Sequence, residues 1–299
     1  MAKAKKPPVD WAQRVADTMA TYIEQNNTLP WLKGWTTNGI FPSNLVTKTE
    51  YKGINALILG MMGSVRGYSS PYYVTIKGMH EKGGTFKDWD NDASMNGLPI
   101  VWWNMLKVED RKTGKDKIIP LLKGWTVYNL DHIDGIEVPK IDRPVIDVPD
   151  AVEHMFDQYP SPPRFTEELS ATAHYSPSLD QIVIPKREQF SSLIQFAETK
   201  AHEGVHSTGH KSRLNRFDND ADVHAAYAKE ELVAEIGAAI LLQRLGMEPE
   251  MQRMADYVKG WGSRIKDDPK MLVSAAGKAD HAVNLILNIA QEKKEEVAA

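Results

Sequence analysis

Two histidines and a glutamate in the second half of the chain are spaced for metal chemistry. Residues 202–206 read His-Glu-Gly-Val-His. Residues four apart on a helix lie about 40° apart around the axis and about 6 Å apart along it, so His202 and His206 can direct their imidazoles at one metal ion. Glu203 is close enough to take a proton from water on that metal. Hydrolytic zinc sites need these parts: protein ligands, one open position and a base.

The residues before this motif predict the helix that such a site requires. Apolar side chains recur at helical spacing between Glu188 and the motif, at Leu193, Phe196, Ala197 and Ala201. Gly209 then provides a natural end for the helix. A pair of histidines on a helix can also be ordinary surface, but an amphipathic helix that ends just beyond the pair favours the metal site.

The third ligand has more than one candidate. His210 follows the first histidine by eight residues, whereas the metzincin pattern places a third histidine ten residues after the first. A helix expected at residues 227–246 offers carboxylates instead, with Glu231 and Glu235 beside a broad apolar face. We expect Glu231 to be the ligand and Glu235 to accept a hydrogen bond from a ligand histidine, although the two roles could be exchanged. We expect Glu230 to face solvent.

The composition is that of a globular protein. The chain has 299 residues, of which 42% are hydrophobic and 25% charged, enough for two domains of ordinary size. It contains no cysteine, which excludes disulfides and thiolate metal sites and suits a reducing cytosol. No apolar run approaches the roughly 18 residues of a membrane span, and the first residues lack the apolar region of a signal peptide. We therefore expect a cytoplasmic protein.

Charge is distributed unevenly along the chain. Residues 1–140 contain 18 Lys+Arg and 14 Asp+Glu, a net charge of +4, and residues 141–299 contain the other 18 and 26, a net charge of −8. Seven of the eight tryptophans also precede residue 140. The two parts are therefore expected to perform different tasks.

Basic residues alternate with aromatic residues in the first part, as a surface for single-stranded nucleic acid requires. Cations follow the phosphates, and rings stack on the bases. The candidates are Lys33, Trp35, Lys48, Tyr51, Lys52, Arg66, Tyr72, Tyr73 and Lys77. Each could instead be ordinary core or solvated surface, because aromatic residues are often buried and +4 is modest for a nucleic-acid binder.

The remaining patterns predict an α+β protein of two domains. We expect an N-terminal domain at 1–140, a proline-rich linker at 141–165 and a C-terminal domain at 166–299. In the first domain we expect two helices and three strands, at 9–25, 54–62, 74–76, 99–108 and 117–129. Residues 174–184 read as strand, turn and strand. We expect residues 181–184 to pair with an extended peptide substrate, as an edge strand beside a metal can do.

Several short stretches identify a resemblance that covers nearly the whole chain. They are residues 30–31, 51–55, 67–71, 175–177, 202–210, 213–215 and 227–239. In these stretches the chain resembles the ArdC family of antirestriction proteins, which conjugative plasmids carry. It departs from that family at residues 89–99, which lack the basic, glycine-rich segment common in these N-terminal domains, so the resemblance does not carry DNA contacts over to that loop.

The resemblance implies an N-terminal domain that binds single-stranded DNA and a C-terminal zincin-like metallopeptidase domain. It implies protection of incoming plasmid DNA from host restriction during conjugation. Our own hypothesis for the enzyme is that it cleaves DNA-bound host proteins. It carries over His202, His206 and Glu231 as ligands of Zn2+, or of another divalent metal such as Mn2+, and Glu203 as the catalytic acid/base. Tyr175 or Tyr227 is a candidate donor to the oxyanion.

Two other readings of the same residues stay open. The protein could coat single-stranded DNA without catalysis and use the metal for structure alone, or it could assist plasmid priming or transfer through partners. The presence of Glu203 favours the enzyme, because a structural metal site needs no base.

Overall fold

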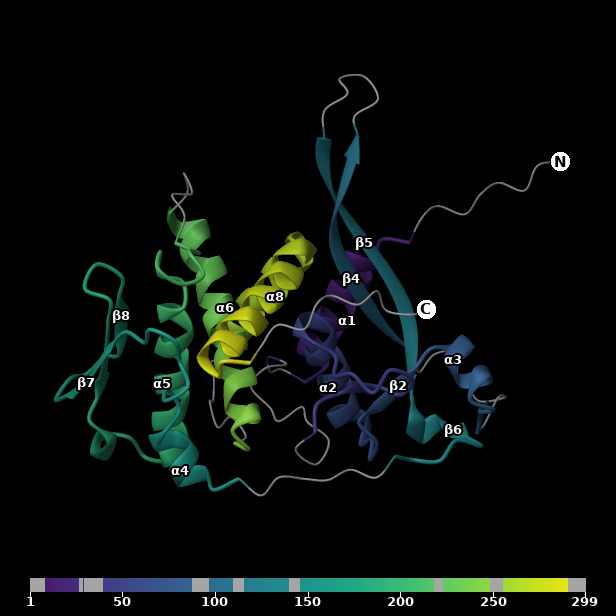
Figure 1. Ribbon diagram of the computed structural model, residues 1–299, viewed down its shortest axis with the longest axis horizontal. Helices are drawn as coiled ribbons and strands as arrows, with labels where there is room; N and C mark the ends of the chain where they lie inside the picture. Colours follow the sequence, from purple (N-terminus) through teal and green to yellow (C-terminus); the bar gives the residue numbers. More distant parts are fainter. Residues whose placement is uncertain are drawn as a thin grey trace.

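The computed structural model describes residues 9–26, 29, 40–87, 97–109, 116–139, 146–217, 223–247 and 255–289. These ranges contain both helices and largely antiparallel sheets, in runs that do not alternate, which confirms the prediction of an α+β fold (Figure 1). None of the helices within them combines the length and apolar character that a transmembrane span requires.

The first part of the chain builds a small sheet with helices packed on it. Its elements are α1 (Trp11–Asn26), β1 (Ser43–Asn44), α2 (Gly53–Arg66), β2 (Tyr72–Val74), α3 (Ile76–Glu81), β3 (Thr85–Phe86), β4 (Leu98–Glu109), β5 (Asp116–Asn129), η3 (Leu130–His132) and β6 (Ile133–Asp134). The four-stranded sheet has the order β1-β2-β5-β4, and β3 pairs with β6. Helices α1 and α2 contact β4, and Leu98, Ile100 and Val101 of that strand are buried.

Local side chains explain one difference from the predicted strand at residues 74–76. Strand β2 ends at Val74, and the side chain of Thr75 accepts a hydrogen bond from the N–H of Gly78. This N-cap begins α3 at Ile76, which the sequence had placed in the strand.

The second part of the chain places a three-stranded sheet beside four long helices. Its elements are α4 (Val148–Glu153), β7 (Arg164–Glu168), β8 (His174–Ser176), β9 (Gln181–Pro185), η4 (Arg187–Gln189), α5 (Leu193–Ser207), α6 (Val223–Arg244), α7 (Ala255–Asp267) and α8 (Pro269–Ile286). The sheet has the order β7-β9-β8, with β7 parallel and β8 antiparallel to β9. Helix α5 packs against β8 and β9 on one side and against α6 on another.

The last two helices join the two parts. Helix α8 lies between α6 and α2 and contacts both (Figure 1). Helix α7 packs on α1, and a single hydrophobic core runs through both parts. Polar contacts reinforce this junction. The carboxyl of Asp280 accepts the backbone N–H of Gly53 at the start of α2, and Arg244 Nη1 lies 2.6 Å from Glu50 Oε2.

Candidate metal centre

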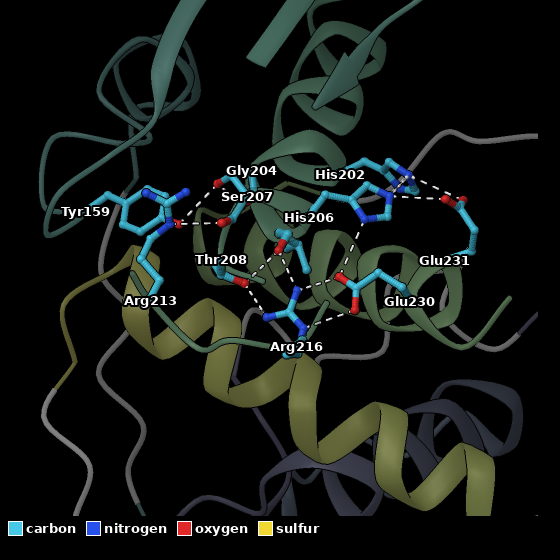
Figure 2. A network of polar contacts seen from close by, with 11 residues as sticks. Tyr159, His202, Gly204, His206, Ser207, Thr208, Arg213, Arg216, Glu230 and Glu231 are labelled. Atoms are coloured by element: carbon cyan, nitrogen blue, oxygen red, sulfur yellow. Dashed lines mark hydrogen bonds and ion pairs between the residues drawn. The ribbon is translucent and has the colours of Figure 1, made fainter. Parts of the chain in front are cut away.

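Helix α5 carries the two histidines on the side that faces α6. The hydroxyl of Ser192 caps the helix by accepting from the N–H of Gln195. The apolar residues that the sequence placed on one face are buried, among them Phe196, Ala197, Ala201 and Val205. Because helical geometry fixes their angular separation from this face, His202 and His206 point together toward α6 (Figure 2).

Helix α6 approaches α5 closely enough to supply a carboxylate. Its apolar face is buried at Leu232, Val233, Ile236, Ala239 and Ile240. Gly237 permits the close crossing, since a Cβ there would lie 2.8 Å from Val205 Cγ1. The crossing places Glu231 beside the two imidazoles.

Three ligand atoms converge between the helices. His202 Nε2 lies 3.1 Å from His206 Nε2, and Glu231 oxygens lie 3.2 Å from His206 Nε2 and 3.7 Å from His202 Nε2. Tetrahedral zinc with bonds of roughly 2.0–2.2 Å holds its ligand atoms about 3.4 Å apart. The donor set therefore fits a divalent ion, and it is the cluster of metal-ligating side chains found in the described ranges. His210 does not join it, since its Nδ1 contacts Ser212 Oγ at 2.7 Å.

Glu203 lies buried next to this cluster. Burial raises the pKa of its carboxyl, and the charge of Glu231 raises it further, against the opposing effects of His206 and of the Tyr175 backbone N–H, which donates to it. A carboxyl with a raised pKa accepts a proton more readily near neutral pH. This property suits a group that takes a proton and returns it.

The second nitrogen of His206 faces a carboxylate that the sequence did not predict. His206 Nδ1 lies 3.5 Å from Glu230 Oε1, and Glu230 also accepts from Arg216 Nη2 at 2.6 Å (Figure 2). Burial alone would lower the pKa of His206, but hydrogen bonds to Glu230 and Glu231 raise it to about 9. The expectation that Glu230 faces solvent is wrong. At His206 the acceptor is Glu230. Glu235, which the sequence predicted as the acceptor for a ligand histidine, is buried on α6, and its role stays a prediction.

The two tyrosines considered as oxyanion donors differ in position. The hydroxyl of Tyr175 donates to Asp180 Oδ1 at 2.7 Å and accepts from Arg213 Nη2 at 3.1 Å. It is therefore committed to another cluster, and its predicted role is wrong. Tyr227 is 66% exposed and hydrogen-bonds to Glu231, at the edge of the ligand cluster.

The sheet beside α5 corrects the expected substrate strand. Strand β9 lies between β7 and β8, so both of its edges are already paired. Residues 181–184 therefore cannot pair with a substrate. Strands β7 and β8 form the two edges of the sheet. Of these, β8 contacts α5, and its Tyr175 N–H donates to Glu203.

Two of the aromatic residues expected on a nucleic-acid surface are part of the core. Tyr51 is 7% exposed, and its hydroxyl accepts from Asn44 Nδ2 at 3.4 Å. Tyr73 is 2% exposed, and its hydroxyl donates to the carbonyl of Leu59 at 2.7 Å. Buried rings cannot stack on bases, so these two predictions do not fit the structure.

The other candidates for DNA contact divide into separate groups. Lys48 Nζ lies 5.1 Å from the ring centroid of Tyr72, and both lie on the β1–β2 side of the sheet. Arg66 belongs to another cluster, in which its Nη1 donates to Tyr68 Oη at 3.1 Å. Lys52 and Lys77 are exposed, and Lys33 and Trp35 lie outside the described residues.

Sequence reasoning did not identify the two arginines that follow α5. The side chains of Arg213 and Arg216 are only 3% and 5% exposed. Both donate to carbonyl oxygens in the last turn of α5, Arg213 to Ser207 and Arg216 to Val205. Cations at a helix C-terminus are a recognisable sequence signal, but the carboxylates that they also bind come from distant segments.

Comparisons with known proteins match both parts of the chain. A family model described as the N-terminal domain of anti-restriction factor ArdC matches residues 9–128, and one described as a zincin-like metallopeptidase matches residues 151–278. The crystal structure of the antirestriction ArdC protein from plasmid R388 is similar in its metal-free form, with 33% identity, a TM-score of 0.72 and coverage of 93% of this chain and 97% of that chain. Its Mn(II)-bound form has 32% identity, a TM-score of 0.73 and coverage of 94% and 98%.

Longer proteins are also similar. Two Escherichia coli proteins named DNA primase TraC are 29% identical over 99% and 97% of this chain. The chain spans only 28% and 21% of their lengths. An uncharacterized Sinorhizobium fredii protein, y4eC, is 25% identical over 93% of this chain and 91% of its own length.

Proposed function

Because this chain belongs to the ArdC family of antirestriction proteins, we propose that it binds single-stranded DNA and hydrolyses peptide bonds at a divalent metal centre. One observation supports the enzymatic part above all. His202, His206 and Glu231 bring three ligand atoms within 4.8 Å of one another, and a buried carboxyl, Glu203, lies beside them. A site that only stabilised the fold would need the ligands but not the base.

Zinc is the proposed metal, with Mn(II) as the alternative because the R388 relative has a Mn(II)-bound structure. His202, His206 and Glu231 would hold it. A metal in this position supplies Lewis acidity, which lowers the pKa of water and polarises a carbonyl.

The chain's own residues would handle the substrate and the proton. Glu203 takes a proton from the attacking water and returns it to the leaving amide nitrogen. The free edge of β8 can align an extended peptide in front of Glu203. Tyr227, beside Glu231 and open to solvent, is the proposed donor to the developing oxyanion.

The DNA-binding part is proposed to lie in the first half of the chain. Its net charge of +4 contrasts with −8 in the remainder, and Lys48 with Tyr72 pairs a cation with a partly exposed ring. Single-stranded DNA bound there would raise the local concentration of any protein on the same strand. We propose cytoplasmic protection of incoming plasmid DNA by this route, with DNA-bound host proteins as substrates.

The experiment that tests the peptidase compares wild type with Glu203→Gln. Each is incubated with a DNA-binding protein, with and without single-stranded DNA. We expect cleavage by the wild type only, stimulated by DNA, and unchanged zinc content and DNA affinity in the variant. Equal cleavage by both proteins, or none by either, would contradict the proposal. The same pair, assayed for antirestriction in cells, tells whether cleavage serves protection.

The TraC relatives favour a second candidate, an accessory role in plasmid priming or transfer. In that case, or if the protein simply coats single strands, Glu203→Gln would retain full activity in conjugation. The same variant therefore separates the catalytic and non-catalytic functions.

A further inference from the structure

The segment that follows α5 contains two arginines, each of which joins the end of that helix to a carboxylate on another element. Buried arginines are rare unless they are paired. The guanidinium is planar and offers five donors in fixed directions, so it can hold a carboxylate and a carbonyl at once in one orientation. The two carboxylates, and the residues that each of them contacts in turn, indicate what the arginines do.

Arg216 is connected through Glu230 to His206, a proposed metal ligand. Its Nη2 donates to the carbonyl of Val205 at 2.9 Å, and its Nε and Nη2 donate to the two oxygens of Glu230 at 3.1 and 2.6 Å. Glu230 Oε1 in turn lies 3.5 Å from His206 Nδ1. These contacts close a ring from α5 through Arg216 and α6 back to the imidazole on α5 (Figure 2).

Arg213 is connected through Asp180 and Tyr175 to Glu203, the proposed base. Its Nε donates to the carbonyl of Ser207 at 2.9 Å, and its Nη1 and Nη2 hold the carboxylate of Asp180. Tyr175 completes this cluster, since its hydroxyl bonds to both Asp180 and Arg213. Strand β8 is thereby held against the end of α5, and the backbone N–H of Tyr175 donates to the carboxyl of Glu203.

We propose that Arg213 and Arg216 are positioning residues with separate tasks. Arg216 orients His206 through Glu230, and Arg213 orients Glu203 through Asp180 and β8. This inference rests on the proposed function in one respect, because Glu203 acts as a base only if the site hydrolyses peptides. Both arginines also bond to carbonyls of α5, the helix that carries His206 and Glu203. Glu230 is therefore held in place relative to His206, and β8 is held in place relative to Glu203.

Zinc affinity of the full chain, measured by competition with a chromophoric chelator, tests the Arg216 branch. We expect Glu230→Gln and Arg216→Lys to bind zinc at least ~10-fold more weakly, because carboxylates that orient ligand histidines contribute about that much. Arg213→Lys should bind zinc like wild type. Arg244→Lys is the matched control, since Arg244 pairs with Glu50 at the junction of the two parts.

A spectroscopic readout covers the case in which a variant loses stability. In zinc-loaded wild type, the proton NMR resonance of the His206 Nδ1–H should lie far downfield, because this N–H donates a hydrogen bond to the carboxylate of Glu230. Glu230→Gln should move that resonance upfield. An unchanged resonance, or wild-type zinc affinity in Glu230→Gln, would overturn the Arg216 branch.

Amide hydrogen exchange tests the Arg213 branch without reference to catalysis. In zinc-loaded Arg213→Lys, the Tyr175 amide should exchange at least ~10-fold faster than in wild type, because Lys cannot reproduce the two-pronged contact that holds β8. Arg216→Lys should leave that amide protected. Unchanged exchange in Arg213→Lys, or equal zinc loss in Arg213→Lys and Arg216→Lys, would refute the division of tasks. If wild type cleaves nothing while these readouts hold, the proposed function fails and the positioning roles stand.

Discussion

At the scale of the residue, the surroundings of the carboxyl groups in the site shift their pKa values in opposite directions. Burial alone would raise the pKa of Glu230 and of Glu231, but hydrogen bonds from His206 keep both pKa values below the ordinary range, and Arg216 adds to this at Glu230. The pKa of Glu203 is raised instead, chiefly by burial. A carboxylate that stays ionised can serve as a ligand, and one that accepts a proton can serve as a base, so environment assigns different roles to similar side chains.

The ligand set gives a prediction about metal content. His206→Ala and Glu231→Ala should each lose most bound zinc and the thermal stabilisation that zinc confers, because binding to the native site adds to the free energy of unfolding. His210→Ala is the matched control and should retain about one zinc per chain. Elemental analysis with thermal unfolding measures both effects. Unchanged zinc in Glu231→Ala would exclude Glu231 as a ligand.

The Asp180–Arg213 pair gives a prediction about pH. Hydrogen bonds from Arg213 hold the pKa of Asp180 below its ordinary value of 3.8. Its contribution to stability is therefore fully present above pH ~4 and is lost as pH falls through the lowered pKa. We expect Asp180→Asn to lose about 1–2 kcal/mol of unfolding free energy at pH 7, with the deficit shrinking below pH ~4. Urea unfolding across pH 3–7 measures this.

Asp157→Asn provides the comparison for that series, because Asp157 is an exposed aspartate in the same part of the chain. It should unfold like wild type at pH 7. A deficit in Asp180→Asn that stays constant down to pH 3 would contradict the assignment of the effect to the carboxylate charge.

At the scale of the element, the site is made by the crossing of α5 and α6. Each helix supplies what the other lacks: α5 carries two imidazoles and the base, and α6 carries the ligand carboxylate. Neither helix alone can assemble three donors. The separation of their axes therefore controls the geometry of the site, and Gly237 against Val205 allows them to approach closely.

Enlarging Gly237 should therefore disturb the site as well as the fold. Gly237→Ala places a methyl group 2.8 Å from Val205 Cγ1, and we expect it to lower the unfolding free energy by about 1–3 kcal/mol. Zinc affinity should fall too, because the added methyl group would push α6 away from α5 and so move Glu231 away from the imidazoles. Gly277→Ala in α8 is the control, since its methyl would meet nothing within 4 Å and it should be neutral or slightly stabilising. Equal zinc affinity in both variants would show that the crossing is more compliant than its packing indicates.

At the scale of the whole molecule, the two parts are coupled through α7 and α8. Residues before 140 contribute α1 and α2 to a core that also contains the face of α6 behind Glu231. A fragment ending at residue 140 would expose the side of α1 that α7 covers and the side of α2 that α8 covers. The two parts therefore share one core, and we expect their stabilities to be coupled.

Calorimetry of the full chain tests this coupling. We expect one unfolding transition, and zinc at 100 times its dissociation constant should stabilise it by about 2.7 kcal/mol. Amide exchange in α1 and α2 should slow on zinc addition, although both helices belong to the part without the ligands. Two separate transitions, only one of them shifted by zinc, would refute a shared core.

The features that depend on local periodicity could be predicted from the residues alone. The spacing of His202 and His206 puts both imidazoles on one face of a helix, and the apolar residues around them determine which face is packed. The apolar stretches at 99–108 and 117–129 predict the two strands of the β4–β5 hairpin. Each of these follows from backbone geometry over a few residues. They were therefore predictable without knowledge of the rest of the chain.

The neighbours that those faces contact could not be predicted, because they depend on how the helices and strands pack together. Glu230 and Glu235 border the same apolar face of one helix, and the rotation of α6 against α5 brought Glu230 to His206 Nδ1. Packing likewise buried Tyr73 and left β8, not β9, at the sheet edge. Periodicity sets relative angles within an element, whereas the rotation, depth and strand order of whole elements come from contacts between segments far apart in the chain.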